Sequence, residues 1–131
     1  MKPRFVIGLS VLALAAGVLA LEKVSIGDLL KDASKYDGKD VTIQGVVEDL
    51  SEKVSGGGNA YTSLKVKDGE KRVTVWMRGH LNIKIKNGDE VAATGMFLKE
   101  RKVGDVIYKN EIDMTSKPGK SYGLELIKAA D

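Results

Sequence analysis

Apolar and polar residues alternate with a period of two along most of the chain after residue 40. Successive side chains of a strand point to opposite faces of its sheet, so this alternation predicts five strands: 41–47, 60–67, 72–78, 91–98 and 106–114. Asp68-Gly69 is typical of a two-residue hairpin turn, and the second and third strands are therefore expected to pair. The glycine-rich segment 55–59 predicts a loop between the first two strands.

The segment before these strands has a different period. Ser25 followed by Asp28 resembles a capping box, and apolar residues then recur at helical spacing as far as Gly38. One short amphipathic helix is predicted here. After Thr115 the tail contains proline and glycine, and only 124–127 is expected to form a short edge strand or a helical turn.

Five short strands would leave two exposed edges in an open sheet, and closing the sheet removes them. Gly45 and Gly95 lie inside the first and fourth strands, where glycine permits the sharp coiling that closure needs. The predicted fold is therefore all-β, a five-stranded antiparallel barrel with one short N-terminal helix. A chain of 131 residues that is 43% hydrophobic suits a single domain of this kind.

The first twenty residues have the composition of an export segment. Lys2 and Arg4 precede an apolar run over 5–21, and small residues lead up to Ala20. We expect a signal peptide over 1–20, cleaved after Ala20, and a folded domain over 21–131 that is periplasmic or secreted. The run is just long enough to span a bilayer, so an uncleaved N-terminal anchor is the alternative, with membrane contact through residues 1–20 alone.

Charge and cysteine content limit the possible ligands. Lys2 and Arg4 are two of the 21 basic residues, and without them the remainder almost balances the 18 acidic residues. Residues 21–70 carry more acidic than basic residues, so the basic excess lies in 71–131, where an anion-binding surface is expected. The chain has no cysteine, which excludes disulfides, a cysteine-based metal or nucleophile site and a lipid-modified N-terminal cysteine.

Three segments resemble a known family when they are taken in order: GKDVTIQGVV, YTSLKVKDGEKRVTVWM and IKNGDEVAATGMF. They are similar to OB-fold domains of the tRNA-anticodon-binding type, and the resemblance covers roughly residues 24–114. It implies a nucleic-acid-binding OB-fold domain, here behind an export signal as in bacterial periplasmic OB-fold proteins. Motifs of this kind describe the fold better than the ligand.

The outward faces of the second and third strands carry aromatic and basic side chains. OB folds bind oligonucleotides and oligosaccharides on this face, together with the loops that join strands one to two and four to five. Aromatic rings stack on bases while lysine and arginine follow the phosphates. The predicted ligand-binding residues, including two from the charged tip between the fourth and fifth strands, are Tyr61, Lys65, Lys67, Arg72, Thr74, Trp76, Arg78, Lys99 and Arg101. In the alternative interpretation Trp76 covers a barrel end or lies under the helix, and the cations form a solvated face.

The leading hypothesis is an exported OB-fold module that binds single-stranded nucleic acid, DNA included, or another anionic oligomer. The alternative is a periplasmic module that docks an envelope protein partner, in the manner of an envelope-stress protein. A haem chaperone of cytochrome c maturation is also an OB fold, but that family attaches haem through a histidine in its C-terminal region, whereas His80 follows the third strand. Catalysis, a metal site and a cofactor are not expected, because His80 stands alone and the acidic residues are scattered.

Overall fold

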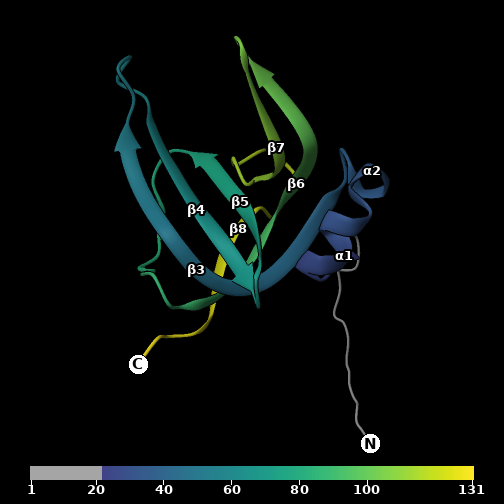
Figure 1. The fold of residues 1–131 in the computed structure, drawn as a ribbon. Coiled ribbons are helices and arrows are strands. Elements are labelled where there is room, and N and C mark those ends of the chain that lie inside the picture. The colour runs from purple at the N-terminus through teal and green to yellow at the C-terminus, as the bar shows by residue number, and fades with distance from the viewer. Residues whose placement is uncertain (1–21) are drawn as a thin grey trace, which may run out of the picture.

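The computed structural model describes residues 22–131, and the predicted signal peptide lies outside the described residues. This part of the chain is all-β with two short helices (Figure 1). None of its helices has the length and apolar character that a membrane crossing requires. The elements are β2 (Glu22–Lys23), α1 (Ile26–Lys31), α2 (Ala33–Tyr36), β3 (Asp40–Val54), β4 (Ala60–Asp68), β5 (Lys71–Arg78), β6 (Glu90–Val103), β7 (Val106–Asp113) and β8 (Gly123–Lys128).

Strands β3 to β7 form a closed, barrel-like sheet, as the alternation predicted. The first half of β3 pairs with β6 and its second half pairs with β4, and the change of partner falls at Val46. A Cβ atom on the preceding residue, Gly45, would collide with the carbonyl oxygen of Lys67, and one on Gly95 would collide with that of Asp113. These two glycines therefore permit the close strand approach that closes the sheet.

The strands differ from the prediction in pairing and in length. Strand β5 pairs with β7 in parallel, so the closed sheet is not a simple meander. Strand β3 continues to Val54 and β6 to Val103, because each extends past the closed sheet as one arm of a long hairpin. The expected charged tip at 99–105 is thus mostly strand. The tail forms the short edge strand β8, paired with β6.

The N-terminal helix is divided in two, which corrects the prediction of a single helix. The Ser25 hydroxyl accepts a hydrogen bond from the Asp28 backbone N–H at 3.1 Å, and this is the predicted cap. The chain then leaves the helical conformation at Asp32, whose φ of −117° and ψ of 44° end α1. Aspartate favours hydrogen bonds outside helix interiors, which explains a break at this residue. Helix α1 places Ile26 and Leu29 in the core, fully buried.

The inward faces of β4 and β5 are the faces that the sequence predicted. Leu64, Val66, Val73 and Val75 are buried in the core, and Met77 is packed against it. Full burial of such an aliphatic side chain stabilises the fold by roughly 1.5–3 kcal/mol, which fixes the register of both strands. The alternate residues of β4 and β5 are consequently turned outward.

The connection from β5 to β6 has no helix, and Asp89 fixes it. The buried Asp89 carboxylate accepts hydrogen bonds from the Ala130 backbone N–H at 2.8 Å, the Lys86 backbone N–H at 3.0 Å and the Lys86 ammonium at 3.0 Å. These donors, first that of Ala130, lower the pKa of Asp89 to about 2. The charged carboxylate therefore ties both the connection and the C-terminal tail to the start of β6.

Candidate functional site

Strand register arranges the outward side chains of β3, β4 and β5 in rows across the sheet. Lys53 is opposite Tyr61, and Tyr61 is opposite Arg78, so the aromatic residue lies between two cations. We call these three residues the Tyr61 row. Tyr61 is partly buried, whereas Lys53 and Arg78 are exposed. Across residues 22–131, neither cation forms an ion pair. Their charges remain available to an anionic ligand.

The next row has small side chains on β3 and β4, and the row after it has a threonine on β5. Ser51 is opposite Ser63, which is opposite Trp76, and in the following row Lys65 is opposite Thr74. Short hydroxyl side chains leave the middle of this face low and polar between larger residues. An extended polymer could therefore lie close to the β4 and β5 backbones.

Trp76 is covered by an arginine from another hairpin. The guanidinium carbon of Arg101 lies 4.5 Å from the centroid of the Trp76 ring and 4.6 Å from that of Tyr108. The Arg101 Nε donates a hydrogen bond to Glu111 Oε1 at 2.9 Å. The indole Nε1 of Trp76 is buried and has no hydrogen-bond partner. We call Trp76, Arg101, Tyr108 and Glu111 the Trp76 cluster.

The position of Trp76 differs from that of a ring open to a ligand. Its ring stacks with a guanidinium, so it is not free for a ligand in this structure. Gly27 of helix α1 lies against the Lys71 side chain, at the beginning of β5, whereas Trp76 lies near the end of that strand. Arg101, which was expected to contact the ligand, instead lies over the Trp76 ring, which was expected to stack on the ligand.

Three other predicted cations have acidic neighbours on β3. Lys67 Nζ is 3.4 Å and Arg72 Nη1 is 3.6 Å from the carboxylate of Glu48. Lys65 Nζ is 3.9 Å from Asp49. Exposed ion pairs of this kind contribute little to stability and can be broken, but they lower the local positive potential. This part of the face is less basic than its lysines and arginine suggested.

Lys99 lies apart from the other predicted residues. Its backbone N–H donates to Asp37 at 2.9 Å, and its ammonium donates to Ser34 Oγ at 2.8 Å. Both partners belong to the helical segment around α2, so Lys99 holds the helix against β6. The structure thus divides the predicted set among the Tyr61 row, the Trp76 cluster, the ion-paired cations and Lys99. Thr74 lies opposite Lys65, between Trp76 and Arg72 on β5.

Three residues at these sites were absent from the sequence-based set: Lys53, Tyr108 and Glu111. Lys53 lies beyond the predicted end of the first strand. Tyr108 is opposite Arg101 in the β6–β7 hairpin, a pairing that the Gly104-Asp105 turn would have indicated. No comparable pattern in the sequence would have identified Glu111.

Two hairpin arms flank this face. The β3–β4 and β6–β7 arms extend to the same side of the molecule, with β5 between them (Figure 1). Near the tip of the β6–β7 arm, Val103, Val106 and Ile107 are each about half exposed, beside the exposed Lys102 and Asp105. The arms correspond to the loops that were expected to border a ligand.

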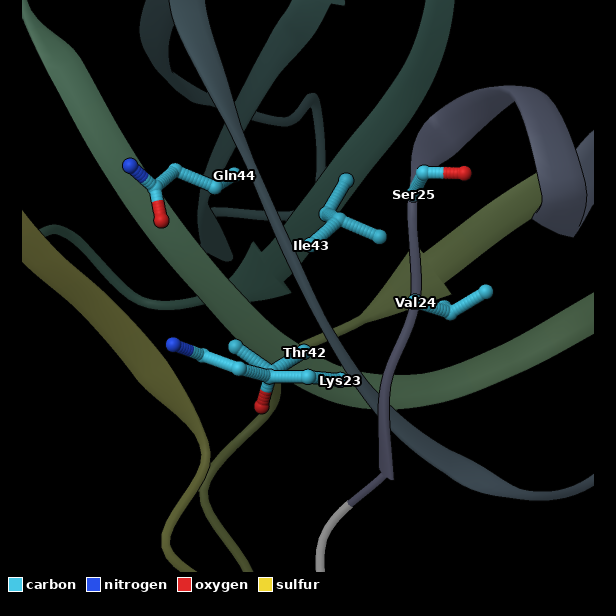
Figure 2. Close-up of a pocket in the computed structure, with 6 residues that line it drawn as sticks. All are labelled: Lys23, Val24, Ser25, Thr42, Ile43 and Gln44. Atoms are coloured by element: carbon cyan, nitrogen blue, oxygen red, sulfur yellow. The ribbon is translucent and has the colours of Figure 1, made fainter. Parts of the chain in front are cut away.

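A hollow of about 230 Å³ lies where β2 meets β3 (Figure 2). The ends of Lys23 and Gln44 point to one side of it, while Val24 and Ser25 point away to the other. The Gln44 amide already donates to Glu90 at 2.8 Å, and Ser25 caps α1. The polar groups do not converge, so this hollow is a poor candidate for a specific site.

A second cavity, of about 210 Å³, lies between the β5–β6 connection and the C-terminal segment. Met77, Met114 and Tyr122 contribute to its lining. The Tyr122 hydroxyl donates to Asp40, and burial together with this bond raises the pKa of Tyr122. The phenol therefore acts as a structural tether. Among residues 22–131, no three side chains of histidine, aspartate or glutamate are placed to hold a metal ion.

No known protein family and no curated protein matches the sequence. Two solved structures are similar in fold. One is a protein named as an aspartyl-tRNA synthetase from Leishmania major Friedlin, with a TM-score of 0.58, 13% identity, and coverage of 82% of this chain and 21% of that one. The other is the structure of yeast Stn1 and Ten1, with a TM-score of 0.55, 13% identity, and coverage of 82% and 63%. This chain thus spans about a fifth of the first protein and less than two thirds of the second. Together with the closed five-stranded sheet, these similarities show that the chain has an OB-type fold.

Proposed function

We propose that the chain is an exported binding module that holds a single-stranded nucleic acid across the outward face of β4 and β5. The observation that carries this proposal is the Tyr61 row, in which an aromatic ring lies between two cations that form no ion pair in the described part of the chain. Each base stacked on an aromatic side chain contributes roughly 1–3 kcal/mol, and neighbouring cations bind the phosphates. The fold similarity to a protein named as a tRNA synthetase is consistent with this ligand class.

The surroundings of the Tyr61 row suit a flexible strand. The low centre formed by Ser51, Ser63 and Thr74 allows the polymer to approach the sheet. The two hairpin arms border the path on the same side of the molecule (Figure 1). The near-neutral charge of residues 21–131 indicates modest affinity, because phosphate neutralisation supplies most non-specific binding.

Fluorescence anisotropy of a labelled oligothymidylate tests the proposal. A length of about twelve nucleotides falls within the roughly 4–16 nucleotides that one OB fold covers. We expect saturable binding at low salt. We also expect the logarithm of the binding constant to fall with the logarithm of salt concentration, with a slope of about −0.7 per phosphate contacted. Absence of binding at low salt would contradict nucleic-acid recognition.

Export is a separate part of the proposal and rests on the sequence of residues 1–20. N-terminal sequencing of the protein recovered outside the cytoplasm should begin at Leu21 if cleavage follows Ala20. An intact Met1 on a membrane-bound product would indicate the uncleaved anchor. An intact Met1 on a cytoplasmic product would overturn export itself.

Exposed apolar side chains near the tip of the β6–β7 arm support a second candidate function, the docking of an envelope protein. Val103, Val106 and Ile107 are each about half exposed, and exposed apolar surface can mark a protein contact. A photo-crosslinking residue at position 107 in intact cells should capture one defined partner. The same residue at position 127, on the exposed β8, is the control. Equal capture at both positions would contradict a specific docking tip.

A further inference from the structure

Arg101 is held on several sides at once. Its guanidinium lies over the rings of Trp76 and Tyr108, and its Nε is bonded to Glu111. The rings fix the plane of the guanidinium, and the carboxylate fixes its rotation within that plane. In the part of the chain that the structure describes, no hydrogen bond or ion pair engages Arg101 Nη1 or Nη2. The two terminal nitrogens can therefore donate hydrogen bonds to a ligand.

Burial differs between the two members of this ion pair. The Glu111 side chain is 7% exposed, whereas that of Arg101 is 29% exposed. A buried carboxylate needs its cation, which accounts for the Nε contact. Pairing through Nε does not explain why part of the Arg101 side chain is exposed to solvent. The free edge of Arg101 is therefore both oriented and accessible.

Arginine recognises phosphate through two parallel N–H donors on one edge of its plane. A lysine in the same place would supply charge without this geometry. Holding the guanidinium in advance reduces the entropy lost when a ligand binds. The arrangement around Arg101 thus has the properties of a prepared phosphate site.

We propose that Arg101 binds a phosphate through its two Nη groups, and that Trp76, Tyr108 and Glu111 are positioning residues that hold it. This inference deepens the proposed function and rests on it for the identity of the ligand. Trp76 then serves Arg101 and does not stack on a base. Tyr61, two residues away from the Ser63–Trp76 row and so roughly 7 Å along the strand, is left as the stacking residue.

The salt dependence of oligothymidylate binding separates these roles. Arg101→Gln removes one phosphate contact, so the slope against salt should become shallower by about 0.7. The affinity at low salt should fall about tenfold. Arg101→Lys should keep the wild-type slope and still lose affinity, because the charge remains while the fork is lost. Tyr61→Ala should lose affinity with the slope unchanged.

A variant of Glu111 distinguishes a phosphate site from a structural brace. Glu111→Gln keeps an oxygen that can accept from Arg101 Nε but removes the competing negative charge, so affinity for the oligonucleotide should rise about threefold. Asp113→Asn is the matched control, because Asp113 belongs to the same strand and the same change in net charge leaves Arg101 untouched. Thermal unfolding of every variant confirms that it is folded. Equal increases in the two variants would contradict a specific role for Arg101.

The outcomes separate this inference from the proposed function. If Arg101→Gln binds with wild-type affinity and slope while Tyr61→Ala is weakened, the phosphate role is wrong and nucleic-acid binding stands. If the oligonucleotide fails to bind but inorganic triphosphate binds with a dependence on Arg101, the phosphate site stands and the nucleic-acid proposal falls. If neither probe binds, both are wrong.

Discussion

The Tyr61 row and the Trp76 cluster each combine an aromatic ring with cations on neighbouring parts of one face, yet their states differ. In the Tyr61 row, Lys53 and Arg78 lie beside the ring without an ion pair in the described structure. In the Trp76 cluster, Arg101 lies over the ring and is paired with Glu111. An aromatic residue is therefore available to a ligand only when its neighbouring cation has not already occupied it.

The difference follows from burial. Glu111 lies inside the sheet region, where an unpaired carboxylate would be costly, so it retains Arg101. Tryptophan is also the best aromatic partner for a guanidinium, which adds to this attachment. No buried acid lies in the Tyr61 row, and exposed charges there cost the fold little. In the Trp76 cluster, part of the Arg101 guanidinium is therefore used for internal contacts, whereas the cations of the Tyr61 row have no ion pair among residues 22–131.

The largest expected effect concerns stacking. Tyr61→Ala should weaken oligothymidylate binding by roughly 1–3 kcal/mol, because a stacked base loses its aromatic partner. Trp76→Phe should change binding much less, since phenylalanine still accepts the Arg101 guanidinium. Anisotropy titrations at one low salt concentration compare the two variants, with Tyr61→Phe as the control that keeps the ring. A larger loss for Trp76→Phe than for Tyr61→Ala would reverse the assignment of the two sites.

Substitutions should lower the free energy of unfolding more in the Trp76 cluster than in the Tyr61 row. Arg101→Ala removes two ring contacts and the partner of a buried carboxylate, and should lower the free energy of unfolding by roughly 1–2 kcal/mol. Arg78→Ala, at an exposed position whose side chain has no ion pair within residues 22–131, should stay within about 0.5 kcal/mol of the wild type. Urea unfolding followed by circular dichroism measures both. Equal losses would mean that Arg101 and Arg78 contribute equally to the stability of the fold.

The sequence alone supported the fold well, because period-two alternation and turn residues determine strands and their inward faces. It was less informative about the site for identifiable reasons. Lys53 was missed because Asp49, with φ at 52°, marks a register shift that carries β3 past its predicted end. The contact of Trp76 with Arg101 joins β5 to β6 across β7, and no local pattern reveals such a pair. Lys99 is bound to α2 through a tertiary contact of the same kind.

The smallest expected effect concerns the ion-paired cations. They have an acidic partner, as Arg101 has, but they lie on the outward face of the sheet, as the cations of the Tyr61 row do. Glu48→Gln frees Lys67 and Arg72 from their shared carboxylate and should raise oligothymidylate affinity about twofold, in keeping with the roughly 0.2–1 kcal/mol of exposed ion pairs. The gain should disappear at high salt, because screening removes both the pairing and the attraction to phosphate. Glu125→Gln, an equal change of charge on the exposed β8, is the control. If both variants gain affinity equally, the change in net charge alone explains the gain. Lys67 and Arg72 would then have no specific part in binding, unlike the residues of the Tyr61 row and the Trp76 cluster.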